Sequence, residues 1–247
     1  MKNAILRDDV LNGLKLLGVH SKMALEVHCS LSRFGYVEGG SAALIDALIE
    51  AVGIEGAIVM PSFRFSRQQP LTEEDKRLGL TLKIQIISED EESSGMGIVS
   101  DTFRKRPDVK TGEGIFRVSA WGQDADKHSA GFQHLIDSDG FALMLGVDIY
   151  SLSSMHYVED VLPKEIRSRF EPSAQARKVY PEDEWIIECW KPDVQPWYKI
   201  QNEAYLKGLI KDSYIGNAKC MLFKVKPVID LYRQALLNNP FELYGLA

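Results

Sequence analysis

The chain is poor in cysteine, has no excess of basic residues and contains no long apolar run. Its three cysteines, Cys29, Cys189 and Cys220, are an odd number without Cys-x-x-Cys spacing. They indicate neither a disulfide framework nor a zinc site, and a reducing compartment is the simplest interpretation. The formal net charge of −6 argues against a nucleic-acid or anionic-membrane surface and weakly favours cationic substrates. No apolar run approaches the roughly 20 residues needed to span a bilayer.

The amino-terminal segment 1–18 carries Arg7, Asp8, Asp9 and Lys15 among its apolar residues, which is unlike a secretory signal. We therefore expect a cytoplasmic protein with no membrane or nucleic-acid partner and no metal site. An apolar fraction of 45% and a charged fraction of 26% are ordinary for a globular protein, and 247 residues suffice for one large α/β domain.

Helical and strand-like patterns alternate from the start of the chain. The apolar spacing predicts helices over 6–17 and 39–52 and strands over 23–27 and 57–60. This order is typical of an α/β fold with parallel strand pairing. Further along, the patterns predict helices over 98–106 and 201–211, another starting at 155 and a last one ending at 237, and strands over 115–121, 141–147 and 218–225.

The continuous apolar run over 141–147 is the best candidate for a buried central strand. The segment 66–94 is charged and weakly periodic, which suggests an excursion from the sheet. Residues 166–199 have an aromatic and β-branched composition, which predicts an added β-rich layer. We expect one domain over residues 1–247, with a central, partly parallel sheet flanked by helices.

A loop of small and hydroxyl residues over 28–40 joins the first predicted strand to the next predicted helix. Free backbone N–H groups at a helix N-terminus suit a phosphate group. Ser30 and Ser32 can donate hydrogen bonds to a pyrophosphate, or can act as cap and turn residues, which such positions also favour. His28 opens the loop, either as a buried side chain or as a direct ligand contact.

In-order motifs along the chain resemble those of the aminoglycoside 3-N-acetyltransferase family. The matching segments are 27–32 with Gly35 and Gly39-Gly40, 56–63, 95–97, 120–122, 145–147, 156–159 and 215–218. The resemblance implies a mixed α/β sandwich of the family's own type, acetyl-CoA as the donor, an amine as the acceptor and a role in antibiotic resistance. It implies that CoA is held by His28, Ser30, Leu31, Ser32, Phe34, Gly35 and Gly39.

The acceptor side departs from the family pattern. Relatives carry a His-Pro pair before the strand that ends in Ala-x-Gly, and that His is taken to activate the amine. Alignment on 120–122 puts Glu113 and Gly114 in its place. Glu113 can serve as the base only if burial or another carboxylate raises its pKa; otherwise it is a solvated turn residue.

His156 and Glu159 are the other catalytic candidates. They lie three residues apart at a predicted helix start, so they point to one side, and imidazole has a pKa suited to a general base. A packing and capping role is the alternative. A covalent role for Cys29 is rejected, since direct transfer to an amine needs no acyl-enzyme.

Three functional interpretations follow. The first is an acetyl-CoA-dependent N-acetyltransferase acting on a small-molecule amine, which could be an aminoglycoside-like amino sugar. The second is a non-catalytic CoA-binding relative with a sensor or accessory role, which the missing His-Pro supports. The third keeps the fold but moves another acyl group. The sequence allows a monomer or a homodimer.

Overall fold

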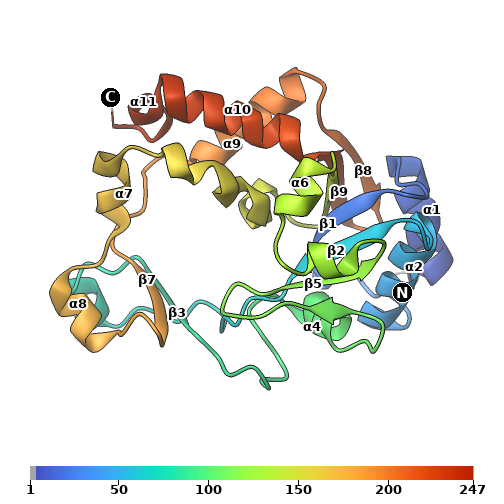
Figure 1. The fold of residues 1–247 in the computed structure, drawn as a ribbon, viewed down its shortest axis with the longest axis horizontal. Coiled ribbons are helices and arrows are strands. Elements are labelled where there is room, and N and C mark those ends of the chain that lie inside the picture. The colour runs from blue at the N-terminus through green and yellow to red at the C-terminus, as the bar shows by residue number, and fades with distance from the viewer. Residues whose placement is uncertain (1–3, 247) are drawn as a thin grey trace.

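A computed structural model describes residues 4–246. Its centre is a sheet of seven strands in the order β4-β5-β2-β1-β6-β9-β8 (Figure 1). The strands are β1 (Ala24–Cys29), β2 (Ala57–Pro61), β4 (Lys110–Thr111), β5 (Val118–Gly122), β6 (Phe141–Leu145), β8 (Lys211–Ile215) and β9 (Ala218–Lys224). β1, β2 and β6 run parallel, and antiparallel strands extend the sheet on both sides. The predicted parallel pairing and the buried central strand over 141–145 are confirmed.

Helices cover both faces of the sheet, because its strands alternate apolar side chains between two cores. α1 (Arg7–Leu17), α2 (Gly40–Val52) and α4 (Ile98–Arg104) pack on one face. The other face is covered mainly by α6 (Gln133–Asp137), α9 (Pro196–Leu206), α10 (Val225–Asn238) and the 3-10 segment η3 (Ser153–Val161). The predicted mixed α/β sandwich is therefore present.

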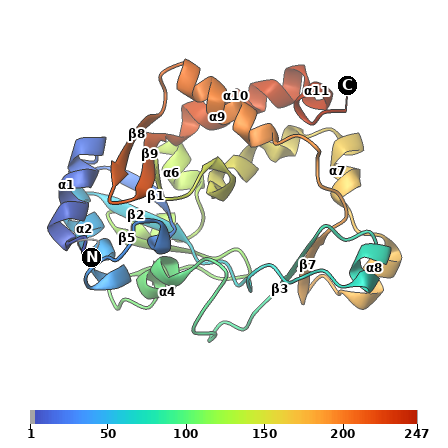
Figure 2. The same cartoon turned by 180° about the vertical axis from the view of Figure 1, so that it is seen from behind.

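A small lobe lies beside the main sheet, as Figures 1 and 2 show from opposite sides. β3 (Leu82–Gln85) pairs antiparallel with β7 (Trp185–Glu188), and α3 (Glu73–Arg77) and α8 (Ala174–Val179) pack nearby. Leu80, Ala176 and Ile187 form its separate apolar cluster. α7 (Lys164–Phe170) connects η3 to this lobe. The remaining short helices are η1 (Leu31–Arg33), α5 (Ala125–His128), η2 (Ile149–Ser151) and α11 (Pro240–Leu243).

The segment 166–199, where a β-rich layer is expected, contains more helical than strand residues. Only β7 is a strand there, and most of α7, all of α8 and the start of α9 occupy much of the rest. Of the aromatic residues in this segment, Trp185 lies in β7, whereas Trp190 lies beyond the strand and packs edge-to-face on Phe170, with ring centroids 4.8 Å apart. None of the helices within residues 4–246 has the length and apolar character needed to cross a membrane.

Candidate active site

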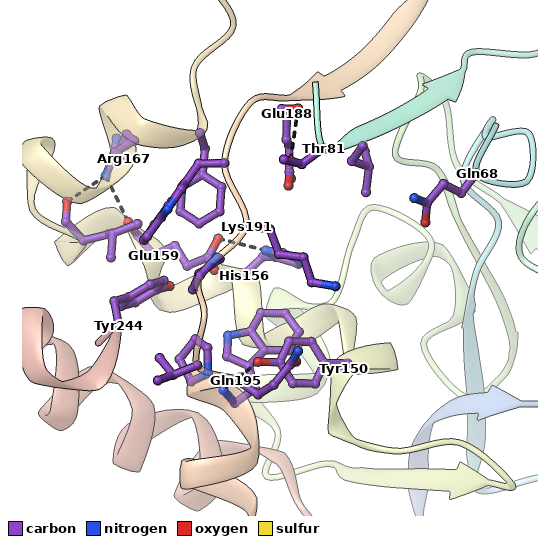
Figure 3. A pocket seen from close by; sticks show the side chains of 18 of the residues that line it. Gln68, Thr81, Tyr150, His156, Glu159, Arg167, Glu188, Lys191, Gln195 and Tyr244 are labelled. Carbon is purple, nitrogen blue, oxygen red and sulfur yellow. Dashed lines mark hydrogen bonds and ion pairs between the residues drawn. The ribbon is translucent and has the colours of Figure 1, made fainter. Parts of the chain in front are cut away.

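A cavity of about 880 Å³ lies between the small lobe and the helices η3 and α9 (Figure 3). The lobe contributes Thr81, Leu82 and Glu188, and the segment that follows it contributes Trp190 and Lys191. His156 and Glu159 come from η3, and Tyr150 and Trp197 complete an aromatic wall. The cavity combines a hydrogen-bonded imidazole–carboxylate pair with further carboxylates and aromatic rings, which is typical of a site for a polar organic molecule.

His156 and Glu159 form an ion pair on the cavity wall. Nδ1 of His156 lies 2.8 Å from Oε2 of Glu159, and the imidazole ring packs edge-on against Trp197 at 5.0 Å between centroids. The His156 side chain is 63% exposed, toward the cavity that it lines. Desolvation in the cavity disfavours the imidazolium and by itself would lower the pKa of His156. The hydrogen bond with Glu159, together with the charges of Glu188 and Glu26, outweighs desolvation, so the pKa of His156 is raised.

The contact with Glu159 also fixes the tautomer of the neutral ring. A carboxylate only accepts, so the proton sits on Nδ1 and the lone pair on Nε2. Among residues 4–246, no hydrogen-bond partner occupies Nε2 of His156. This atom can therefore take a proton from a molecule in the cavity.

Two tyrosines lie behind Glu159. The hydroxyl of Tyr232 donates to Oε1 of Glu159 at 3.3 Å and lies 2.7 Å from the hydroxyl of Tyr244. Arg167 of α7 donates to the backbone carbonyls of Glu159 and Asp160 at 2.9 and 3.2 Å, so it caps the end of η3. Side chains from α7 and α10, together with Tyr244, thus hold this end of η3.

Glu188 enters the cavity from β7, on the wall that the small lobe provides (Figure 3). The pKa of its carboxyl is raised, mainly because of burial. The charge of His156 opposes this increase, and the charge of Glu159 adds to it. Within the described part of the chain, no side-chain hydrogen bond or ion pair satisfies this carboxylate. A partly desolvated carboxylate without a partner favours a cationic ligand.

The predicted loop over 28–40 follows β1 and leads into α2. Gly35, Gly39 and Gly40 have φ angles of 101°, 76° and 60°, which side chains other than glycine rarely adopt. The N-cap residue of α2, Gly39, offers no side-chain acceptor, so N–H groups of the first turn stay available. The backbone here fits a phosphate group.

The other predicted loop residues differ in accessibility. Ser32 is exposed and Ser30 half-buried, with their hydroxyls 3.3 Å apart, and Leu31 packs partly against the core. Phe34 is fully buried in that core, so its side chain has no surface for a ligand and its role is packing. Burial also raises the pKa of the Cys29 thiol well above its ordinary range, which disfavours a nucleophilic thiolate.

His28 is buried, with Nε2 2.8 Å from Oε1 of Glu26, and the N–H of Ser153 points to the same nitrogen at 3.4 Å. The start of the loop therefore lies next to the start of η3 in space. By contrast, Glu113 is exposed in the turn before β5 and is not among the residues that line the cavity. The structure brings His156 and Glu159 together and does not bring Glu113 to them.

Sequence patterns missed Glu26, Glu188, Tyr232 and Tyr244. For Glu26 a signal exists: two polar residues at i and i+2 within an apolar strand, Glu26 and His28, must share one face of the sheet. No comparable signal exists for the others, which come from β7, α10 and the residue after α11. Within residues 4–246, no group of three or more histidine, cysteine or carboxylate side chains is placed to share a metal ion.

Comparisons with known proteins agree with this fold. A relative from Bacillus subtilis (strain 168), described as SPbeta prophage-derived aminoglycoside N(3')-acetyltransferase-like protein YokD, is 28% identical over 94% of this chain and 93% of its own. The crystal structure of aminoglycoside acetyltransferase AAC(3)-IVa has a TM-score of 0.72 at 21% identity, covering 99% of this chain and 92% of that one. A binary complex of AAC-IIIb with CoASH has a TM-score of 0.66 at 17% identity, covering 95% and 97%.

The family model described as Aminoglycoside 3-N-acetyltransferase matches residues 27–237, which span both the loop after β1 and the His156–Glu159 pair. The match extends over most of the sheet and over all residues that line the cavity except Tyr244. The chain therefore belongs to the aminoglycoside 3-N-acetyltransferase family, and it is an acyltransferase of that family.

Proposed function

We propose that this protein transfers the acetyl group of acetyl-CoA to an amine of a cationic, aminoglycoside-like acceptor, with His156 as the general base. The observation that carries the proposal is Nε2 of His156, which has no hydrogen-bond partner among residues 4–246 and belongs to a cavity-lining side chain whose Nδ1 is held by Glu159 at 2.8 Å. Family membership and the CoASH complex of a structural relative support the donor.

The residues after β1 fit the phosphates of CoA. The N–H of Gly40 donates to the carbonyl of Val37 at 3.1 Å, but the N–H groups of Ser41 and Ala42, at the start of this 13-residue helix, have no backbone acceptor among residues 4–246. An added Cβ at Gly40 would meet no atom within 4 Å, so space for a ligand exists there. Ser30 and Ser32 would add hydroxyl donors. When bound, acetyl-CoA supplies a thioester carbonyl as the electrophile.

The side chains of the cavity then have distinct roles. Nε2 of His156 accepts the proton that the acceptor nitrogen loses as its lone pair forms the new amide bond. Glu159 stabilises the imidazolium that results, and the unpartnered carboxylate of Glu188 attracts the cationic acceptor. The C–S bond breaks, and the departing sulfur takes the proton from Nε2 of the His156 imidazolium, which gives CoASH and regenerates the base. No acyl-enzyme is needed.

Release of free thiol from acetyl-CoA, measured with a panel of amines, tests the reaction. His156→Gln should lower kcat on the order of 10²–10⁴-fold, because a general base contributes about that much. His20→Gln is the matched control, since His20 is exposed and its imidazole bonds, among residues 4–246, only to the adjacent carbonyl of Ser21. Activity of His156→Gln equal to that of the parent would refute His156 as the base.

Calorimetry tests the donor site separately. Gly39→Ala should weaken CoA binding, since its Cβ would lie 2.9 Å from that of Ala43 at the loop–helix junction. Gly53→Ala is the control, because Gly53 has a similar φ of 66° at the opposite end of the same helix. CoA binding without turnover on any amine would favour the non-catalytic interpretation.

A further inference from the structure

The two oxygens of Glu159 are held by different partners. Oε2 pairs with Nδ1 of His156 at 2.8 Å, and Oε1 accepts the hydroxyl of Tyr232 at 3.3 Å. Because both oxygens are engaged, the carboxylate cannot rotate without losing one contact. The hydrogen bond from Tyr232 therefore helps to fix the carboxylate orientation that the contact with His156 requires.

Tyr232 is in turn backed by Tyr244, with their hydroxyls 2.7 Å apart. Both side chains are buried, with 0% and 4% exposure. Burial raises the pKa of Tyr244 to about 12 and raises that of Tyr232 further, so both stay neutral at physiological pH. Glu159 can only accept from Tyr232, so the remaining hydrogen bond runs from Tyr244 to Tyr232. The chain of donation is Tyr244 to Tyr232 to Glu159.

We propose that Tyr232, supported by Tyr244, is a positioning residue that fixes the orientation of Glu159 and, through it, the ring of His156. This inference rests on the proposed role of His156 as general base. Two neutral hydroxyls cannot take up the proton of His156, so they orient the pair rather than relay protons. Without the Tyr232 hydroxyl, Glu159 is free to turn away and His156 loses its oriented partner.

Other charged and titratable groups also face the His156–Glu159 pair and contribute to its electrostatic environment. They are Glu26 of β1, Glu188 of β7, Lys191 after it, Tyr150 of η2, Arg167 of α7 and Asp160 of η3, which pairs with Arg233. None of these side chains hydrogen-bonds the carboxylate oxygens of Glu159 among residues 4–246. Tyr232→Phe therefore removes one hydrogen bond to Glu159 and leaves all of these charges in place.

The test uses Tyr232→Phe and Tyr244→Phe, with Tyr205→Phe as the matched control. Tyr205 bonds to Asp212 at 2.9 Å and does not line the cavity. The pKa of His156 is measured by NMR titration of the free protein, which needs no turnover. kcat and KM for acetyl-CoA are measured alongside it.

For Tyr232→Phe we expect kcat to fall about tenfold, KM for acetyl-CoA to stay unchanged, and the pKa of His156 to fall toward the ordinary value of about 6.5. Tyr244→Phe should change kcat and the pKa in the same direction by less. A kcat of Tyr232→Phe within twofold of the parent would overturn the proposal. So would a lower kcat with a His156 pKa that does not fall, since loss of packing alone would then explain it. If the parent acetylates no amine, the proposed function fails while the NMR titration still tests the contact.

Discussion

Glu26 of β1 holds the start of η3 through the backbone of Ser154, whose N–H donates to Oε1 of Glu26 at 3.1 Å. The same oxygen lies 2.8 Å from Nε2 of His28, at the start of the loop that we assign to CoA. One buried carboxylate thus connects the proposed donor loop with the segment that carries His156. In the proposed mechanism, the relative placement of donor and base would therefore depend on this residue.

Replacement of Glu26 should destabilise the fold. Glu26→Leu removes the acceptor of the Ser154 N–H in a buried setting, and an unsatisfied buried polar group costs about 1–3 kcal/mol. Glu26→Gln keeps an amide oxygen and should lose less. Urea unfolding measures both free energies, with Glu55→Gln as a surface control because Glu55 pairs only with exposed Lys22. Equal stability of Glu26→Leu and the parent would refute the anchoring role.

The rate should depend on pH through His156. Its raised pKa means that the ring stays protonated to a higher pH, so the acid limb of kcat/KM should lie above the ordinary histidine value of about 6.5. Glu159→Gln removes the main cause of the shift and should move this limb down while lowering kcat. Glu203→Gln, which lies on the surface of α9 beside Lys207, should leave the profile unchanged. If the acid limb of kcat/KM lies at the same pH in Glu159→Gln and in the parent, then His156 is not the group that causes this limb.

The same pair should make stability pH-dependent. A folded-state pKa above that of the unfolded chain means that the folded protein binds the proton more tightly. The stabilisation from His156 and Glu159 is thus fully present below about pH 6.5 and lost as the pH rises through the raised value. The difference in unfolding free energy between the parent and Glu159→Gln should shrink over that interval.

The ionised carboxylate of Glu188 should lower the free energy of unfolding and favour binding of the acceptor. Its raised pKa shows that the fold disfavours the ionised form, so stability falls as the pH rises from the ordinary carboxyl value toward the raised one. At neutral pH, Glu188→Gln should therefore leave the unfolding free energy unchanged or slightly higher, while KM for a cationic amine increases several-fold. Steady-state kinetics with amines of one and two positive charges would show the larger increase for two. A KM that is unaffected for both would refute a binding role.

The small lobe should depend on its buried ion pair. Nζ of Lys83 lies 2.5 Å from Oδ2 of Asp75, and Tyr180 donates to the other oxygen. Burial opposes ionisation of Asp75, but the bonds from Lys83 and Tyr180 outweigh it and lower the pKa of Asp75. Its stabilisation is thus present above about pH 3.9 and is lost as the pH falls below this value.

Asp75→Asn leaves the charge of Lys83 buried without its partner and should cost about 3–5 kcal/mol. Hydrogen exchange should show faster opening of β3 and β7 than in the parent, with little change in β1 and β6. Glu73→Gln on the same helix, whose partner Lys76 is exposed, should change stability by less than about 0.5 kcal/mol. Equal protection of β3 in Asp75→Asn and the parent would show that the pair is dispensable.

The sheet could be predicted from sequence because its signals are local. Apolar residues with helical spacing and the continuous run over 141–147 identify α1, α2 and β6 almost to the residue. The lobe could not be predicted in the same way. α7 and α8 have only 7 and 6 residues, too few for a clear apolar period in the sequence.

The site shows the same division. His156 and Glu159 are close in sequence, and their spacing alone predicts a shared face. Tyr232 reaches Glu159 from 73 positions away, so no local pattern reveals it. Glu113 is a candidate because alignment on 120–122 puts it where relatives carry the His-Pro pair, but it lies exposed in the turn before β5 and does not line the cavity.

The apolar cluster and buried ion pair of the small lobe make it a unit that can change by itself. Its cavity-lining residues Leu82 and Glu188 belong to a two-stranded ribbon that shares no strand with the main sheet. In the proposed function, substitutions there would alter which amine is accepted while the loop after β1 keeps its shape. A mutant library confined to this ribbon would then change acceptor selectivity on an unchanged donor scaffold.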